Sequence, residues 1–171
     1  MIGPTACDGA ARNPMLTNRT KYALKALHHL ARRHGQGLTR AADIAEAENI
    51  PHKFLELILS ELRNNGLIRS QIGRGGGCEL ARPADEISVL SIIRAVEGPA
   101  APLPCVSRTA YVRCADCADE DACGARRLMA QVHEAALEVM GETMLADSLA
   151  PPRRSPSAKA KSAVDRARSR R

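Results

Sequence analysis

The chain has 171 residues, of which 44% are hydrophobic, 26% are charged and only 2% are aromatic. This length holds one domain of ordinary size and excludes a large enzyme, while the scarcity of aromatic residues favours aliphatic helices over a β-sandwich. The net charge of +6 is unevenly distributed, because residues 15–82 carry +5, residues 83–152 carry −6 and residues 153–171 carry +7. A basic segment beside an acidic one indicates that the first contacts a polyanion and that the second is kept away from it.

The sequence shows neither a membrane-spanning segment nor an export signal. It has no apolar run long enough for a transmembrane helix, and its N-terminus lacks the basic start and apolar stretch of a secretory signal. We therefore predict a cytoplasmic protein with no membrane partner, whose six cysteines are mostly outside disulfides. Residues 151–171 contain almost no large apolar residue and are predicted to be a basic disordered tail.

The first half of the chain predicts three helices. One begins at Thr17 or Asn18, either of which can cap it, and its apolar residues recur at helical spacing until glycines end the run. Thr39 can cap a short second helix, and a third helix begins around Pro51 and stops at residues 64–66. The second and third helices are joined by about four residues, a spacing typical of a helix-turn-helix.

A β-hairpin is expected to follow, with residues 67–71 paired to 78–81 around a glycine-rich loop. In this loop Arg74 and the backbone amides of Gly75 and Gly76 can approach a phosphate or a groove closely. The loop is not a nucleotide-binding P-loop, since it lacks the Gly-Lys-Ser/Thr ending and a βαβ unit. The predicted fold is mainly α with a small β-wing, that is, a winged helix-turn-helix.

The second half predicts two more helices around an irregular stretch. Ser88 can cap a helix that ends at Gly98, and a long helix runs from about residue 124 to 149. Its length of roughly 39 Å is too great to be buried against a small domain alone, so we expect it to pair with its copy in a homodimer. The alternative is packing along the body of its own chain. Its apolar stripe consists of Met129, Val132, Ala136, Val139, Thr143 and Ala146.

Polar residues of the third helix are candidates for reading double-stranded DNA. His52, Lys53 and Glu56 lie opposite its apolar face, where the edges of bases would be met. Basic side chains in this half of the chain are candidate phosphate contacts, since phosphates are bound mainly by Lys and Arg. These candidates are Arg19, Lys21, Arg40, Arg63 and Arg74.

Four of the cysteines, Cys105, Cys114, Cys117 and Cys123, follow the pattern C-x8-C-x2-C-x5-C within nineteen residues. Four soft ligands so close together suit zinc or an iron–sulfur cluster, and the residues alone leave both metals open. Two further interpretations are a metal-free thiol sensor with a disulfide such as Cys114 to Cys123, and a structural zinc module. Catalysis is not expected, because the sequence contains none of the common metalloprotease, serine-hydrolase or P-loop motifs.

Taken together, these features resemble the Rrf-type bacterial transcription regulators over about residues 15–150. The resemblance rests on LTNRTKYALKAL at 16–27, the helix and glycine-rich wing at 43–83, ISVLSIIRAVEG at 87–98, and the cysteine cluster with its following helix. It implies a dimer whose helix at 51–65 enters the major groove, with Glu56 reading an operator, and whose wing reaches the minor groove. One departure is Cys78, which stands where family members usually have an aromatic residue.

The resemblance also implies a cofactor. Family sensors hold a [2Fe–2S] or [4Fe–4S] cluster with three cysteines and a variable fourth ligand, so iron–sulfur becomes the expectation and zinc the lesser alternative. The three would be Cys105, Cys117 and Cys123, with Cys114 as a fourth ligand or as a thiol that closes a disulfide when the cluster is lost. A change of cluster state would then alter DNA binding in response to iron, redox stress or nitric oxide.

The expected organisation follows from these assignments. Because Met15 stands where the family's proteins begin, residues 1–14 are taken as a disordered N-terminal extension. We expect a winged helix-turn-helix domain at 15–98, a cysteine-rich sensor loop at 99–123, a dimerisation helix at 124–150 and the tail at 151–171.

Overall fold

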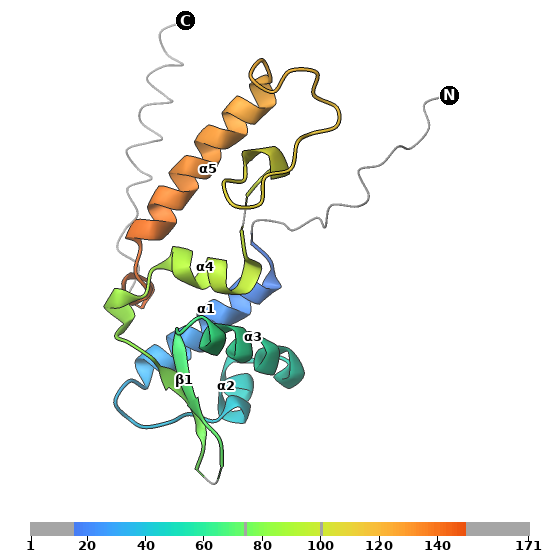
Figure 1. The fold of residues 1–171 in the computed structure, drawn as a ribbon. Coiled ribbons are helices and arrows are strands. Elements are labelled where there is room, and N and C mark those ends of the chain that lie inside the picture. Colours follow the sequence, from blue (N-terminus) through green and yellow to red (C-terminus); the bar gives the residue numbers. More distant parts are fainter. Residues whose placement is uncertain (1–15, 74, 100, 150–171) are drawn as a thin grey trace, which may run out of the picture.

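The computed structural model describes residues 16–73, 75–99 and 101–149, and the expected N-terminal extension, the tail and Arg74 lie outside these ranges. The described residues form five α-helices and one two-stranded antiparallel sheet, with short 3-10 turns between them, as Figure 1 shows. This confirms the predicted fold, mainly α with a small β-wing. The elements are α1 (Asn18–Arg32), α2 (Ala41–Glu48), α3 (His52–Asn64), β1 (Ile68–Gln71), β2 (Gly77–Leu80), α4 (Val89–Glu97) and α5 (Gly124–Glu142).

Helices α1 to α4 and the wing, the β1–β2 hairpin, share one hydrophobic core and are called the body below. Each helix contributes one apolar face, as expected from its spacing of aliphatic residues. The N-terminal cap of α1 is Thr17, whose side chain accepts a hydrogen bond from the amide of Arg19, and that of α4 is Ser88, which accepts from Ser91. The largest fully buried side chains of the core include Leu27, Ile44, Leu55, Ile58, Leu62, Leu67, Ile87 and Ile92.

The wing pairs Ile68 with Leu80 and Gln71 with Gly77, within one residue of the predicted register. The expectation that Thr39 caps α2 is wrong, because Arg40 occupies that position without a side-chain cap bond. Thr39 instead exchanges two backbone hydrogen bonds with Cys78, at 2.9 and 2.8 Å. Such paired backbone bonds satisfy two buried groups at once, which a single cap bond does not.

The predicted end of the last helix is also wrong. Helix α5 ends at Glu142, and Thr143 has extended backbone angles. The amide of Val89 donates to the carbonyl of Thr143 at 2.9 Å, and the amide of Leu145 donates to that of Ile87 at 2.8 Å. Leu145 is fully buried in the core of the body. The chain after Glu142 is therefore apolar at Leu145 because it returns to the core, and not because the helix goes on.

Two faces of α5 have different surroundings. One face packs against α4, with His133 as its buried residue and with Leu137 and Met140 beside α4 residues Leu90 and Ile93. The other face carries exposed apolar side chains, namely Leu128, Val132 and Val139. Residues 101–123 are called the cysteine segment below. Figure 1 shows α5 leaning away from the body, with the cysteine segment beside it and far from the wing. Within the described ranges, no helix combines the length and apolar character needed to cross a membrane.

Candidate nucleic-acid interface and thiol cluster

Helix α3 presents a polar face opposite its buried one. Leu55, Ile58, Leu59 and Leu62 are buried, whereas His52, Lys53 and Glu56 are exposed on the first turns. The imidazole Nδ1 of His52 lies 3.6 Å from the carboxylate of Glu56, a spacing of four residues that places both on one side. The structure therefore brings these three predicted base-reading residues together on an accessible surface.

A groove of about 340 Å³ separates α3 from the wing. Glu56, Ser60 and Arg63 line it from α3, and Ser70 and Ile72 line it from the hairpin. The guanidinium of Arg63 lies 3.5 Å from the hydroxyls of both Ser60 and Ser70, so it stands between the two walls. The α3 wall thus supplies a cation and a hydroxyl, and the hairpin wall supplies a second hydroxyl. Such groups are suited to contacting a phosphate backbone.

The tip of the wing is built from glycines for steric reasons. Gly73 and Gly75 have φ angles of 120° and 86°, which other residues rarely adopt, and a Cβ on Gly76 would lie 2.3 Å from the carbonyl oxygen of Gln71. Ile72, beside this tip, is 92% exposed. Among its described residues, the tip of the hairpin therefore exposes glycine backbone and the large apolar side chain of Ile72.

The remaining predicted phosphate contacts have different surroundings. Arg40 is exposed at the start of α2, and Lys21 is exposed on α1 with its ammonium 5.7 Å from the ring centre of Tyr22. Arg19 is not a free cation, because its guanidinium forms an ion pair with Glu61 of α3. Of the four basic candidates that the structure describes, Arg63 is the one that lies in the groove between α3 and the wing.

Cys117 interacts with both Cys114 and Cys123 before the start of α5, and these three residues are called the thiol cluster below. Hydrogen bonding with Cys123, together with burial and the neighbouring Cys114, raises the pKa of Cys117 to about 11. Cys123 caps α5 and accepts a hydrogen bond from the amide of Arg126 at 3.5 Å. That backbone bond, with the bond from Cys117, lowers the pKa of Cys123. Cys123 therefore ionises more readily than Cys117.

Cys105, the fourth predicted ligand, is buried in a 3-10 turn. Its carbonyl accepts a hydrogen bond from the Nε of Arg126 at 3.2 Å, so Arg126 links the two ends of the cysteine segment. In the described part of the chain, no set of three or more Cys, His, Asp or Glu side chains is arranged to hold a metal ion. The thiols that interact are thus Cys114, Cys117 and Cys123, and Cys105 is held near them through its backbone.

Acidic side chains surround the thiol cluster. Glu120 accepts a hydrogen bond from the hydroxyl of Tyr111 at 2.5 Å, and Asp121 lies 3.6 Å from the guanidinium of Arg126. Sequence reasoning missed Ser60, Ser70 and Ile72 in the groove, because single small or apolar surface residues carry no periodic signal.

The body, its grooved α3–wing face and the attached cysteine segment define a winged-helix transcriptional regulator. The sequence model of the Rrf2 family, described as an iron-dependent transcriptional regulator, matches residues 16–151. The chain therefore belongs to the Rrf2 family of transcriptional regulators.

Known proteins support this assignment over most of their length. An Rrf2-like helix-turn-helix regulator of Rhodobacter capsulatus is 42% identical over 139 residues, which are 80% of this chain and 93% of that protein. The solved structure of CymR, named the global cysteine regulator of B. subtilis, has a TM-score of 0.64 and 33% identity, covering 78% of this chain and 95% of that one. The structure of T. potens IscR has a TM-score of 0.62 and 28% identity, covering 78% and 85%.

Proposed function

We propose that the chain is a homodimeric regulator that binds an operator in double-stranded DNA and uses the thiol cluster as its sensor. The observation that carries this proposal is that one chain combines an exposed polar face on α3 with a group of interacting thiols. Helix α3 of the body carries an exposed polar face, and three interacting thiols lie before the start of α5. Family membership supports the regulatory role.

DNA binding would use α3 in the major groove and the wing in the minor groove. His52, Lys53 and Glu56 are the proposed base-reading residues, and the groove cation Arg63 is the proposed phosphate contact. The glycine backbone at Gly75 and Gly76 allows close approach to the sugar–phosphate chain. Arg74, which lies outside the described residues, stays a candidate because of its position in the wing loop.

Dimerisation would use the outer face of α5. Leu128, Val132 and Val139 are spaced four and seven residues apart, so they share one side of the helix, and all three are exposed in the single chain. A second copy of the same helix would cover them and would bring two reading faces to successive half-sites of an operator.

The proposed sensor group is an iron–sulfur cluster of the [2Fe–2S] or [4Fe–4S] type, and the donor set fits it by chemistry. Cys114, Cys117 and Cys123 would hold it, since thiolates are the usual ligands and these thiols already interact. When bound, the cluster supplies a redox-active and nitrosylation-sensitive centre. Arg126 favours ionisation of Cys123 through its amide and secures Cys105 through its guanidinium.

The experiment is an anaerobic purification followed by visible spectroscopy and iron and sulfide analysis. We expect sulfide-to-iron charge-transfer absorption that is lost in Cys114→Ser, Cys117→Ser and Cys123→Ser. Cys78→Ser is the matched control, because Cys78 is buried in the body and contacts none of these thiols. A colourless wild-type protein after anaerobic iron and sulfide reconstitution would contradict the cluster.

Loaded and emptied wild-type protein are then titrated with one duplex that the protein selects from a random-sequence pool. Affinities that differ by about 5- to 150-fold between the two states are expected of a sensor. Equal affinities would contradict the sensing role while leaving DNA binding intact.

A second candidate is a metal-free thiol switch, favoured by the hydrogen bond between Cys117 and Cys123 and by the lowered pKa of Cys123. The Cys123 thiolate would attack one oxygen of hydrogen peroxide, forming a sulfenic acid and releasing hydroxide, which takes up a proton to become water. Cys117 would then displace a second water and close a disulfide. The Cys114–Cys123 disulfide stays an alternative pairing. Mass spectrometry of colourless, peroxide-treated protein would show the Cys117–Cys123 bond if this candidate holds.

A further inference from the structure

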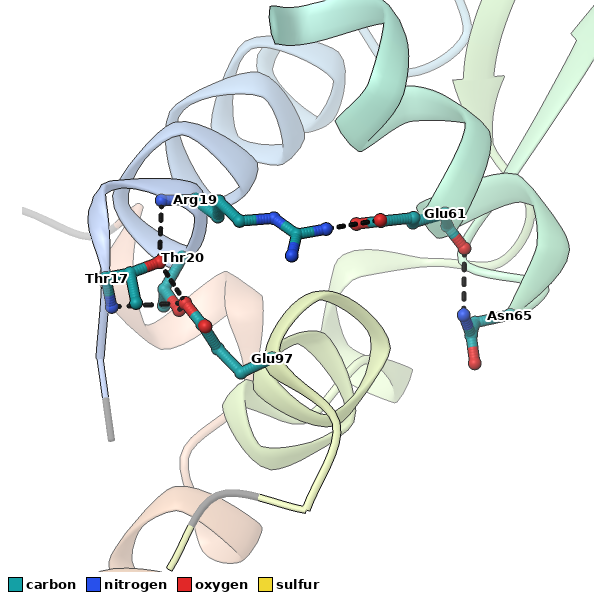
Figure 2. A network of polar contacts seen from close by, with 6 residues as sticks. All are labelled: Thr17, Arg19, Thr20, Glu61, Asn65 and Glu97. Atoms are coloured by element: carbon teal, nitrogen blue, oxygen red, sulfur yellow. Dashed lines mark hydrogen bonds and ion pairs between the residues drawn. The ribbon is translucent and has the colours of Figure 1, made fainter. Parts of the chain in front are cut away.

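A buried carboxylate joins the end of α4 to the start of α1, as Figure 2 shows. Glu97, the last residue of α4, is 7% exposed. Its Oε1 accepts hydrogen bonds from the amide of Thr17 at 3.1 Å, the hydroxyl of Thr17 at 2.5 Å and the hydroxyl of Thr20 at 2.6 Å. Three donors on one oxygen fix the end of α4 against the first turn of α1.

The carboxylate is held in its charged form. Burial acts to raise the pKa of Glu97, but the hydrogen bonds from Thr17 and Thr20 outweigh it and lower that pKa. Moving a buried charge away from its donors leaves it without compensation, which is costly. A displacement of Glu97 is therefore expected to displace the start of α1 with it.

The first turn of α1 also contacts α3 through an ion pair. The hydroxyl of Thr17 accepts a hydrogen bond from the amide of Arg19 at 3.0 Å, and the guanidinium of Arg19 pairs with Glu61 of α3. In the same part of α3, the side chain of Asn65 donates to the carbonyl of Glu61 at 2.9 Å. Figure 2 shows these contacts as a path from α4 through α1 to α3.

The two ends of this path lie close in sequence to the two proposed functional regions. Gly98, with a φ of 75°, directly follows Glu97 and begins the turn into the cysteine segment. Glu61 lies five residues after the proposed base-reading residue Glu56 on the same helix. The path thus runs from the segment that carries the thiol cluster to the helix that carries the reading face.

We propose that Glu97 and Arg19 are positioning residues, which couple the state of the cysteine segment to the placement of α3 on DNA. This inference rests on the proposed function. A purely structural role for the same contacts would affect folding stability and DNA affinity equally in both states of the sensor. A coupling role changes the ratio between the two states, so the ratio is the quantity to measure.

The experiment compares the DNA affinity of the full chain in its cluster-loaded and cluster-free forms at one fixed salt concentration. If the protein is colourless, its reduced and peroxide-oxidised forms are compared instead. Wild type, Glu97→Gln and Arg19→Met are titrated with the same selected duplex. Glu97→Gln keeps the shape of the side chain and removes its charge. We expect each variant to move the affinity ratio toward one by about 2- to 30-fold.

Arg32→Met is the matched control. Arg32 is also on α1 and forms an ion pair with Glu48 of α2 at 2.6 Å, but it has no contact with the path. We expect it to leave the affinity ratio unchanged. The double variant Glu97→Gln with Arg19→Met should lose no more of the ratio than the larger single effect, because both act in one path.

Opposite outcomes have distinct meanings. A wild-type ratio that persists in Glu97→Gln and Arg19→Met overturns the coupling and leaves the proposed function standing. A wild type that binds DNA equally in both states overturns the sensing function, and the coupling with it. If Glu97→Gln does not fold, Thr20→Ala, which removes one of the three donors, replaces it under the same criterion.

Discussion

The body and the outer arm, residues 101–142, bury their side chains to very different extents. Helix α3 has 13 residues and buries four leucine or isoleucine side chains, whereas α5 has 19 residues and buries only His133. The wing and α1 to α4 are stabilised by one shared core. The outer arm instead presents apolar residues and interacting thiols at its surface. The comparison teaches that burial stabilises the body, while the arm keeps exposed the apolar side chains that the proposed dimer would cover.

The largest expected effect separates two leucines of α3. Leu55→Ala should lower the free energy of unfolding by about 2–5 kcal/mol, since Leu55 is fully buried and its removal leaves a cavity. Leu57, two residues along and 63% exposed, is the matched control, and Leu57→Ala should change stability by less than about 0.5 kcal/mol. Urea denaturation measures both. Equal effects would break the distinction between the two faces of α3.

A second prediction concerns the exposed face of α5. Val132→Lys and Val139→Lys should each weaken the dimer about tenfold or more, because they place like charges opposite each other across a two-fold interface. Sedimentation velocity over a dilution series measures this effect. Thermal unfolding should change little, since both valines are exposed in the single chain. Gln131→Lys, on another side of the helix, is the control, and an unchanged dimer in the valine variants would place the interface elsewhere.

A third prediction contrasts cysteines of the two regions in metal-free, reduced protein. Burial raises the pKa of Cys78 to about 11, whereas the amide of Arg126 helps to lower that of Cys123. Iodoacetamide should therefore modify Cys123 at least about tenfold faster than Cys78, because the thiolate is the reactive form. Peptide mass spectrometry over a time course gives both rates. Comparable rates would show that the wing opens readily.

The smallest expected effect is an acid dependence of stability. The folded-state pKa of Glu97 is lowered from its ordinary value of 4.5, so its charged form stabilises the fold above that value. This contribution is lost as the pH falls through the folded-state pKa. The Tm of wild type should exceed that of Glu97→Gln near neutral pH, and the gap should narrow in acid. Differential scanning fluorimetry across the range measures it, and a gap independent of pH would contradict the ionised state.

The sequence predicted the elements whose signals are local. Thr17 and Ser88 are identified as caps because capping depends on neighbouring residues, and α3 follows from its aliphatic spacing. Thr39 and the end of α5 were mispredicted because distant partners decide them. The backbone of Cys78 hydrogen-bonds to that of Thr39, and the amide of Leu145 donates a hydrogen bond to the carbonyl of Ile87.

The site shows the same division. The exposed positions of His52, Lys53 and Glu56 follow from helical periodicity alone. Spacing indicated a cysteine cluster but not which thiols meet, since that depends on the path of an irregular segment. The ion pair of Arg19 with Glu61 joins residues far apart in the sequence and had no local signal.

The return of the chain at Leu145 makes the outer arm an excursion with both ends in one core. It leaves the body at Glu97 and rejoins it where the amide of Leu145 bonds to Ile87. An insertion held in this way can change its length and ligand chemistry without altering the framework that supports the reading face. The body therefore holds the outer arm at both chain ends and along the contact between α4 and α5.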